Sequence, residues 1–231
     1  PSGMKPRKVA ILWFLLMVAL PWVCRAQSHD FGGILELGFE QKLAKGLELG
    51  LEGEGRFNHC FTSFNRLKIG ANLDYSFLKK KRLKVSLGAA YLLYNRYGTI
   101  ENRGRIIGSL TYTEKFSDFK LSLRARVQST FYDMQRGYHK FNPKTYLRGR
   151  LQFDYTFSQL RMSIFASTEI FLSLYKKNNI FIENFRTIAG CNFKMGNGHT
   201  LGVFLRVDNE VQVSDPENVY YIGLRYNFKN K

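Results

Sequence analysis

Residues 118–133, DFKLSLRARVQSTFYD, carry two different faces along one line of residues. The positions between the apolar ones are polar and include Arg124 and Arg126. This alternation predicts a strand with one apolar and one charged face, because successive side chains of a strand point to opposite sides. The apolar row of the stretch is Phe119, Leu121, Leu123, Ala125 and Val127.

The same alternation recurs along the whole chain, and no helical period is sustained. At 231 residues the chain is the size of one ordinary domain, and 15% aromatic residues with only five Pro favour strands. The sequence therefore predicts a single all-β domain. Its eleven apolar rows span residues 35–39, 47–51, 67–77, 83–93, 106–112, 119–131, 147–157, 160–172, 185–193, 201–207 and 220–228.

The first 26 residues have the pattern of a cleaved secretory signal peptide. Basic residues precede an apolar run over 9–23, which is shorter than the ~20 residues of a membrane-spanning helix. Small residues at Cys24 and Ala26 suit a signal peptidase, so the domain is expected over 27–231. Acylation of Cys24 is the alternative, disfavoured by the bulky Trp22 and Val23 before it. Residues 1–3 precede Met4, and their origin is left open.

The chain is strongly basic, with 35 Lys and Arg against 18 Asp and Glu. The basic residues are scattered singly, and an exported protein rarely meets nucleic acid. Nucleic acid is therefore not expected as a partner. The expected partners are outer-membrane lipids, lipopolysaccharide and small anionic solutes. After cleavage only Cys60 and Cys191 remain, and they predict no disulfide framework. The oligomeric state is left open.

Strand length separates a membrane barrel from a soluble sandwich, since both alternate. The twelve steps of residues 119–131 rise about 28 Å at ~3.3 Å per residue and a tilt near 45°, close to the ~25 Å apolar band of a membrane barrel. The sheet must close, because an unpaired edge in hydrocarbon leaves its amides without partners. Aromatic residues border the rows as interfacial girdles require: Tyr91, Tyr97, Phe131, Tyr155, Phe157, Phe193, Tyr226 and Phe228.

The connections between the rows predict a closed antiparallel transmembrane β-barrel with short periplasmic turns and longer extracellular loops. Eleven rows conflict with the even strand number of single-chain bacterial barrels. We therefore expect ten to twelve strands, with the first row inside the lumen or one strand merged or missed. Short turns are expected near 44–46, 79–82, 117–118, 158–159 and 196–198, and longer loops near 58–64, 98–102, 134–143, 176–179 and 214–218.

Short patterns of strand and charge occur at residues 30–32, 45–52, 120–126, 146–151 and 223–228. They resemble the outer-membrane barrel family known as domain of unknown function 2490 (DUF2490). The resemblance covers nearly the whole mature chain and implies export and outer-membrane insertion, while it implies nothing about activity. Barrels of this kind usually end at the last aromatic, whereas three residues follow Phe228 here.

The positions opposite the apolar rows predict a charged lumen with acids on one wall and arginines on the other. Arginine suits such a wall because it stays charged and its fork binds carboxylate or phosphate through two hydrogen bonds. The predicted basic wall is Arg103, Arg105, Lys120, Arg124, Arg126, Arg148, Arg150 and Arg161. The predicted acidic wall is Glu36, Glu40, Glu48, Glu52, Glu54, Asp208 and Glu210.

Two interpretations of this lumen stay open. It is a narrow, mildly anion-selective pore, or a plugged scaffold or surface-interaction barrel whose charged residues satisfy one another. No cofactor is expected. Four scattered His and two Cys show no metal-ligand spacing, and no glycine loop suited to phosphate is present.

An enzyme is not expected, because the His-x-Ser pair shared by outer-membrane acyl hydrolases is absent. The alternative is a lipid hydrolase that pairs His139 with Ser129 or Ser63. The basic and aromatic loop at 134–143 is a candidate contact for lipopolysaccharide, and a plain solvated loop is the other interpretation.

Overall fold

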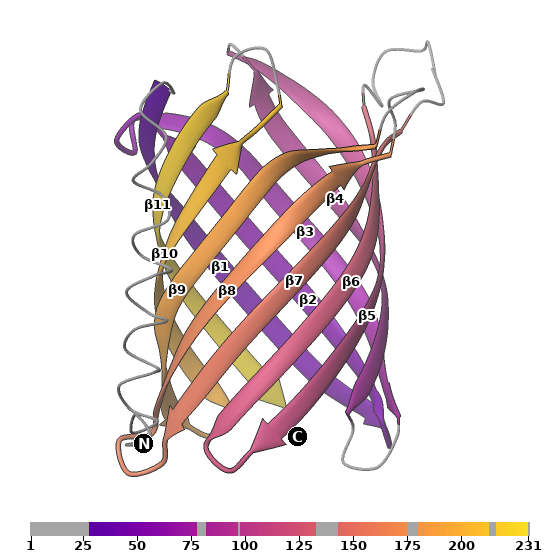
Figure 1. The fold of residues 1–231 in the computed structure, drawn as a ribbon, viewed down its shortest axis with the longest axis vertical. Helices are drawn as coiled ribbons and strands as arrows, with labels where there is room; N and C mark the ends of the chain where they lie inside the picture. Colours follow the sequence, from indigo (N-terminus) through magenta and orange to yellow (C-terminus); the bar gives the residue numbers. More distant parts are fainter. Residues whose placement is uncertain are drawn as a thin grey trace, which may run out of the picture.

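The computed structural model describes residues 28–77, 82–96, 98–132, 143–174, 180–212 and 216–230, which form eleven strands in one closed barrel (Figure 1). The predicted signal peptide and nearly all of the loop at 134–143 lie outside these ranges. Within them, no helix is long and apolar enough to cross a membrane. The strands are β1 (Ser28–Ala44), β2 (Leu47–Asn58), β3 (Ser63–Phe77), β4 (Leu83–Arg96), β5 (Thr99–Phe116), β6 (Phe119–Phe131), β7 (Lys144–Phe157), β8 (Met162–Ser173), β9 (Phe181–Gly196), β10 (His199–Glu210) and β11 (Glu217–Asn230).

Each strand pairs antiparallel with the next in sequence, and the barrel closes where β1 pairs parallel with β11. The pairing runs from Ser28 opposite Glu217 to Gln41 opposite Asn230. Ten successive reversals leave the first and last of the eleven described strands pointing the same way, so the closing pair must be parallel. The predicted closed barrel of ten to twelve strands is therefore confirmed, but its closing pair is parallel where an antiparallel sheet was expected, and β1 belongs to the wall.

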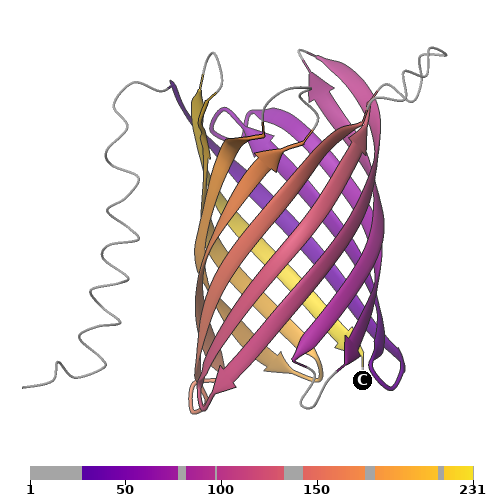
Figure 2. The same ribbon diagram turned by 45° about the vertical axis from the view of Figure 1, so that its right-hand side comes forward.

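The strands run from one end of the barrel to the other, as Figures 1 and 2 show, and the connections at the two ends differ in their number of residues. The longer connections at one end join β6 to β7, β8 to β9 and β10 to β11, as predicted. The prediction of a longer loop near 98–102 is wrong, because β5 already begins at Thr99. Arg96 pairs with Thr99, so β4 and β5 meet in a tight turn. Gly98 adopts a φ of 81°, and its amide donates to Asn95 Oδ1 at 3.0 Å. Glycine tolerates this left-handed conformation, and the asparagine side chain holds the turn.

The outer face of the barrel is apolar and the inner face is largely charged. Leu37 and Leu87 point outward, with about two thirds of their surface exposed (64% and 66%), whereas Arg206 points inward and is 4% exposed. The period-2 alternation of the sequence thus places the apolar rows outside, and the eleven predicted rows lie on the eleven strands except for Leu160, which precedes β8.

Apolar side chains also fill part of the lumen beside the closing seam. Ile34, Phe165, Phe204 and Tyr221 form one buried cluster from β1, β8, β10 and β11. A Cβ atom placed on Gly223 would lie 2.1 Å from the Phe204 ring, so glycine at this position makes room for the ring. The packed core of this protein therefore lies inside the barrel, against the seam.

Candidate functional site

The inward positions of β5, β6 and β7 hold most of the predicted basic wall. Ile106 and Leu123 are exposed on the outside of these strands, so the alternate positions face the lumen. The inward residues are Arg103, Arg105, Lys120, Arg124, Arg126, Arg148 and Arg150.

Arg161 does not belong to this wall. It is exposed in the turn between β7 and β8, with a φ of 49°, and its carbonyl accepts a hydrogen bond from the amide of Lys194 at 2.9 Å. The sequence suggests a strand that starts at Leu160, but the turn extends through Arg161 and β8 begins at Met162. Two further turn residues therefore remove this arginine from the lumen.

The predicted acidic residues also occupy inward positions, but at different depths. Glu54 and Asp208 are buried, whereas nearly half of the Glu40 side chain (48%) and of the Glu52 side chain (43%) is exposed. Depth therefore divides them into buried partners of arginine and residues near the end of the barrel. The inward acids are Glu36, Glu40, Glu48, Glu52 and Glu54 on β1 and β2, and Asp208 and Glu210 on β10.

Buried acids and arginines alternate in space and do not form two opposed walls. Glu54 Oε1 accepts hydrogen bonds from Arg56 Nη2 at 2.9 Å and from Arg66 Nη2 at 2.6 Å. Asp208 Oδ1 accepts from Arg186 Nε at 2.7 Å and from Arg206 Nε at 2.9 Å. The prediction of an acidic wall opposite a basic wall is therefore wrong for these buried residues, because acids and arginines lie side by side and pair.

Several ion pairs link strands that are not neighbours, and one of them spans both strands of the closing seam. Arg56 Nη1 on β2 lies 3.8 Å from Asp208 Oδ2 on β10, although β1 and β11 separate these strands in the sheet. Both side chains are nearly buried. The pair therefore passes behind the parallel seam and narrows the lumen there.

Four arginines of β6 and β7 form what we call the arginine cluster: Arg124, Arg126, Arg148 and Arg150. Arg124 lies directly opposite Arg150, and Arg126 directly opposite Arg148. Like charges at directly opposite positions destabilise a sheet. Among the described residues the cluster contacts one carboxylate, Glu169 on β8, whose Oε1 accepts from Arg124 Nη2 and whose Oε2 accepts from Arg148 Nη2, both at 2.7 Å.

Aromatic rings support the guanidinium groups in the lumen. The guanidinium carbons of Arg148 and Arg186 lie 4.2 and 4.6 Å from the centre of the Phe171 ring. Arg56 lies 5.0 Å from the centre of the Tyr221 ring. Such cation–π contacts restrict the arginines while leaving their hydrogen-bond donors available in the plane of the fork.

Four arginines and one glutamate that contact Glu54, Asp208 or the arginine cluster are absent from the predicted walls. Each occupies an inward position of a predicted strand, so the alternation that identified the other residues also marks these. What the sequence does not show is that they contact one another, because they come from strands far apart in the chain. They are Arg56, Arg66, Glu169, Arg186 and Arg206.

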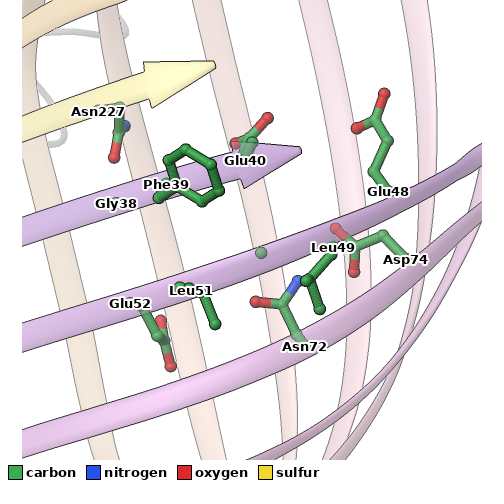
Figure 3. Close-up of a pocket in the computed structure, with 11 residues that line it drawn as sticks. Gly38, Phe39, Glu40, Glu48, Leu49, Leu51, Glu52, Asn72, Asp74 and Asn227 are labelled. Carbon is green, nitrogen blue, oxygen red and sulfur yellow. The ribbon is translucent and has the colours of Figure 1, made fainter. Parts of the chain in front are cut away.

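A second charged region lies at the short-turn end of the barrel, where a pocket of about 150 Å³ opens beside β1, β2 and β3 (Figure 3). We call it the acidic pocket; its acids are Glu40, Glu48, Glu52 and Asp74. Each has a lysine partner. Lys229 Nζ donates to Glu40 at 2.7 Å and to Glu48 at 3.0 Å, Lys84 Nζ lies 2.9 Å from Asp74, and Lys68 Nζ lies 3.1 Å from Glu52.

The hydrolase alternative rests partly on His139, which lies outside the described residues. Of its suggested partners, Ser129 has its hydroxyl 2.9 Å from Thr145 Oγ1. Within the described ranges, no group of three or more His, Cys, Asp or Glu residues could hold a metal ion.

Comparison with known proteins places this fold among porin-like barrels. A solved structure of the NanC porin in a rhombohedral crystal form is similar with a TM-score of 0.53 and 12% sequence identity, over 84% of this chain and 97% of that one. An anion-selective porin from Comamonas acidovorans has a TM-score of 0.39 and 13% identity, over 80% of this chain and 54% of that one. No curated protein matches the chain.

The charged lumen, the closed sheet and the apolar outer face thus belong to a porin-like barrel whose activity is uncharacterised. The model of one protein family matches residues 31–230, which include nearly all of the described barrel. The chain therefore belongs to the family described as protein of unknown function (DUF2490).

Proposed function

We propose that this protein is an outer-membrane barrel that gives small anions a narrow passage. The observation that carries the proposal is the arginine cluster, in which one carboxylate among the described residues pairs with only two of the four inward-facing guanidinium groups. Fixed positive charge in a confined lumen with low-dielectric walls attracts anions and repels cations. Anion preference is the direct electrostatic consequence of this surplus.

The outer surface supports a membrane setting. Leu35, Leu37 and Leu123 are each more than half exposed, and a row of this kind is unfavourable in water but suits lipid. Aromatic pairs such as Tyr155 with Phe157 border it near the short-turn end. We therefore propose membrane lipids and lipopolysaccharide as its surroundings, with the predicted signal peptide as the route of export.

The passage is expected to be narrow. Arg56 and Asp208 meet across the inner side of the seam, and the cluster around Phe204 occupies part of the lumen. The fold shared with the NanC porin supports a conducting role at reduced width. The Arg56–Asp208 pair and the cluster around Phe204 also favour a second candidate function. In it the barrel is plugged by its own side chains and acts as a scaffold or surface-interaction protein.

Reconstitution into a planar bilayer separates the two candidates. We expect small conductance steps and, under a salt gradient, a reversal potential of the sign that anion preference gives. The double variant Arg126→Gln/Arg150→Gln should lose most of that preference. Arg161→Gln is the matched control, because it removes the same charge from an exposed turn outside the lumen.

Each failure has a distinct meaning. A barrel that migrates heat-dependently on a denaturing gel, and is thus folded, but gives no conductance steps would reject the pore in favour of the plugged barrel. Conductance with cation preference would reject the anion proposal alone. We propose no catalytic role; phospholipid turnover that disappears in His139→Ala would replace this assignment with a hydrolase.

A further inference from the structure

We propose that the arginine cluster forms a saturable binding site for one oxyanion, held between Arg126 and Arg150. The ligand class is an anion with at least two oxygen acceptors, such as a phosphate, sulfate or carboxylate group. This goes beyond the proposed passage, because such a site can be occupied whether or not ions cross the barrel.

The first step is the placement of the four guanidinium groups. Arg124 and Arg150 are directly opposite on β6 and β7, and the next inward positions along these strands put Arg126 opposite Arg148. Figure 1 shows these two strands side by side with β8 in the barrel wall. Residues directly opposite have Cβ atoms about 4.5–5.5 Å apart, so the four side chains leave the sheet from neighbouring positions on its inner face.

The second step is that Glu169 pairs with other arginines and not with Arg126 or Arg150. Its two oxygens accept from Arg124 and Arg148, and Arg186 Nη1 lies 3.8 Å from Oε2. The other terminal nitrogen of Arg148, Nη1, donates to Gln128 Oε1 at 2.6 Å. Although Arg150 lies opposite Glu169 in the sheet, the carboxylate is turned toward other partners.

The third step is that Arg126 and Arg150 are left without partners. Within the part of the chain that the structure describes, neither side chain makes a hydrogen bond or an ion pair, and Arg126 Nε is buried without an acceptor. Both residues are partly accessible from the lumen. A confined charge without a counterion is unfavourable by several kcal/mol, and a bound anion removes that penalty.

The geometry of arginine then selects the kind of anion. A guanidinium group presents parallel N–H donors that fit two oxygens of one phosphate, sulfate or carboxylate group, whereas a halide cannot use both forks in this way. Arg105 on the neighbouring β5 donates to Thr130 Oγ1 at 3.1 Å and has no carboxylate within ion-pair distance among the described residues. Its charge adds to the field, so doubly charged oxyanions should bind more tightly than singly charged ones.

Titration of the purified, folded barrel in uncharged detergent tests the site. Inorganic phosphate, sulfate and acetate are added separately, with chloride keeping the ionic strength constant, and the unfolding temperature and heat of binding are recorded. We expect saturable binding of sulfate and phosphate, weaker binding of acetate, and no saturable response to chloride. The order of the three anions separates an inorganic oxyanion from a carboxylate as the preferred ligand.

Variants locate the binding. Arg126→Gln and Arg150→Gln should each weaken sulfate binding by about tenfold or more, the effect of losing a charge-assisted hydrogen bond. Arg126→Lys keeps the positive charge but loses the paired N–H donors of the guanidinium group. Its affinity for sulfate should therefore lie between that of the unchanged protein and that of Arg126→Gln. Lys84→Gln is the matched control within the lumen, since its ammonium group already pairs with Asp74, and it should bind as the unchanged protein does.

Two outcomes would overturn the site. One is an unchanged protein that responds to sulfate and phosphate no differently from chloride, a result that needs no variant to fold. The other is saturable binding that survives in the double variant Arg126→Gln/Arg150→Gln. The passage is judged separately by conductance: binding without conductance keeps the site, and conductance without saturable binding rejects the site alone.

Discussion

The arginine cluster and the acidic pocket are both charged regions of one lumen, yet they balance charge in different ways. In the acidic pocket four carboxylates meet three lysines, and each carboxylate has an ammonium group within 3.1 Å. In the arginine cluster Glu169 pairs with Arg124 and Arg148 and leaves the other two guanidinium groups without a carboxylate among the described residues. The pocket is thus close to neutral, whereas the cluster retains a surplus of positive charge.

The difference shows how position along the barrel changes the contribution of an ion pair to stability. The Lys229 and Glu40 side chains are each about half exposed (47% and 48%), so water already solvates their charges. Glu169 is 4% exposed, and its arginines have little other solvation. Unpaired charge near water is solvated and destabilises the fold little. Unpaired charge in the narrow lumen has little solvation, so a bound counterion stabilises it strongly.

Removal of the carboxylate at the centre of the cluster should have the largest effect. Glu169→Gln leaves Arg124, Arg148 and Arg186 without their shared partner, and breaking a buried ion pair on one side costs about 3–5 kcal/mol. Urea unfolding of the barrel in detergent measures this loss. The counterpart in the acidic pocket, Glu52→Gln, should cost less than about 1 kcal/mol, and equal losses would contradict the comparison.

Removal of an unpaired arginine should change stability in the opposite direction. In chloride without oxyanion, Arg150→Gln relieves repulsion across the strand pair and should raise the free energy of unfolding by about 0.5–1 kcal/mol. Lys84→Gln should instead lower it slightly, because Asp74 loses its partner. Urea unfolding of both variants under identical conditions checks the signs. A destabilised Arg150→Gln barrel would show that this arginine has a partner within the folded protein.

The smallest effect is expected at the end of the acidic pocket. Lys229→Gln removes the partner of Glu40 and Glu48, but these half-exposed pairs contribute about 0.2–0.5 kcal/mol. Unfolding measured at low salt and at 1 M salt should show the difference disappearing at high salt, where the Debye length falls to about 3 Å. A loss that persists at high salt would mean that the lysine acts through packing.

The alternation of the sequence predicted most of the strands and both faces of the sheet. Leu123 and Arg124 fall on opposite faces because successive side chains of any strand do so, and this needs no knowledge of the neighbours. Boundaries were less predictable. Arg161 lies one residue outside β8, and Gly98 closes a turn where a loop was expected, since both depend on local backbone geometry.

The contacts of the site required knowledge of the closed barrel. Glu169 is an unremarkable inward residue in the sequence, and its position among three arginines follows from the register of β6 to β9. Arg56 reaches Asp208 only because β1 and β11 bring β2 and β10 together. Such long-range pairs leave no periodic trace along the chain.

The sequence by itself determined an all-β barrel with an apolar exterior and a lumen rich in arginine, because these properties depend on side-chain type and a period of two. Only the tertiary structure decided that eleven strands close through a parallel pair, that buried acids and arginines interleave, and that Arg126 and Arg150 have no counterion among the described residues. These features depend on register and closure, which join residues that the chain holds far apart.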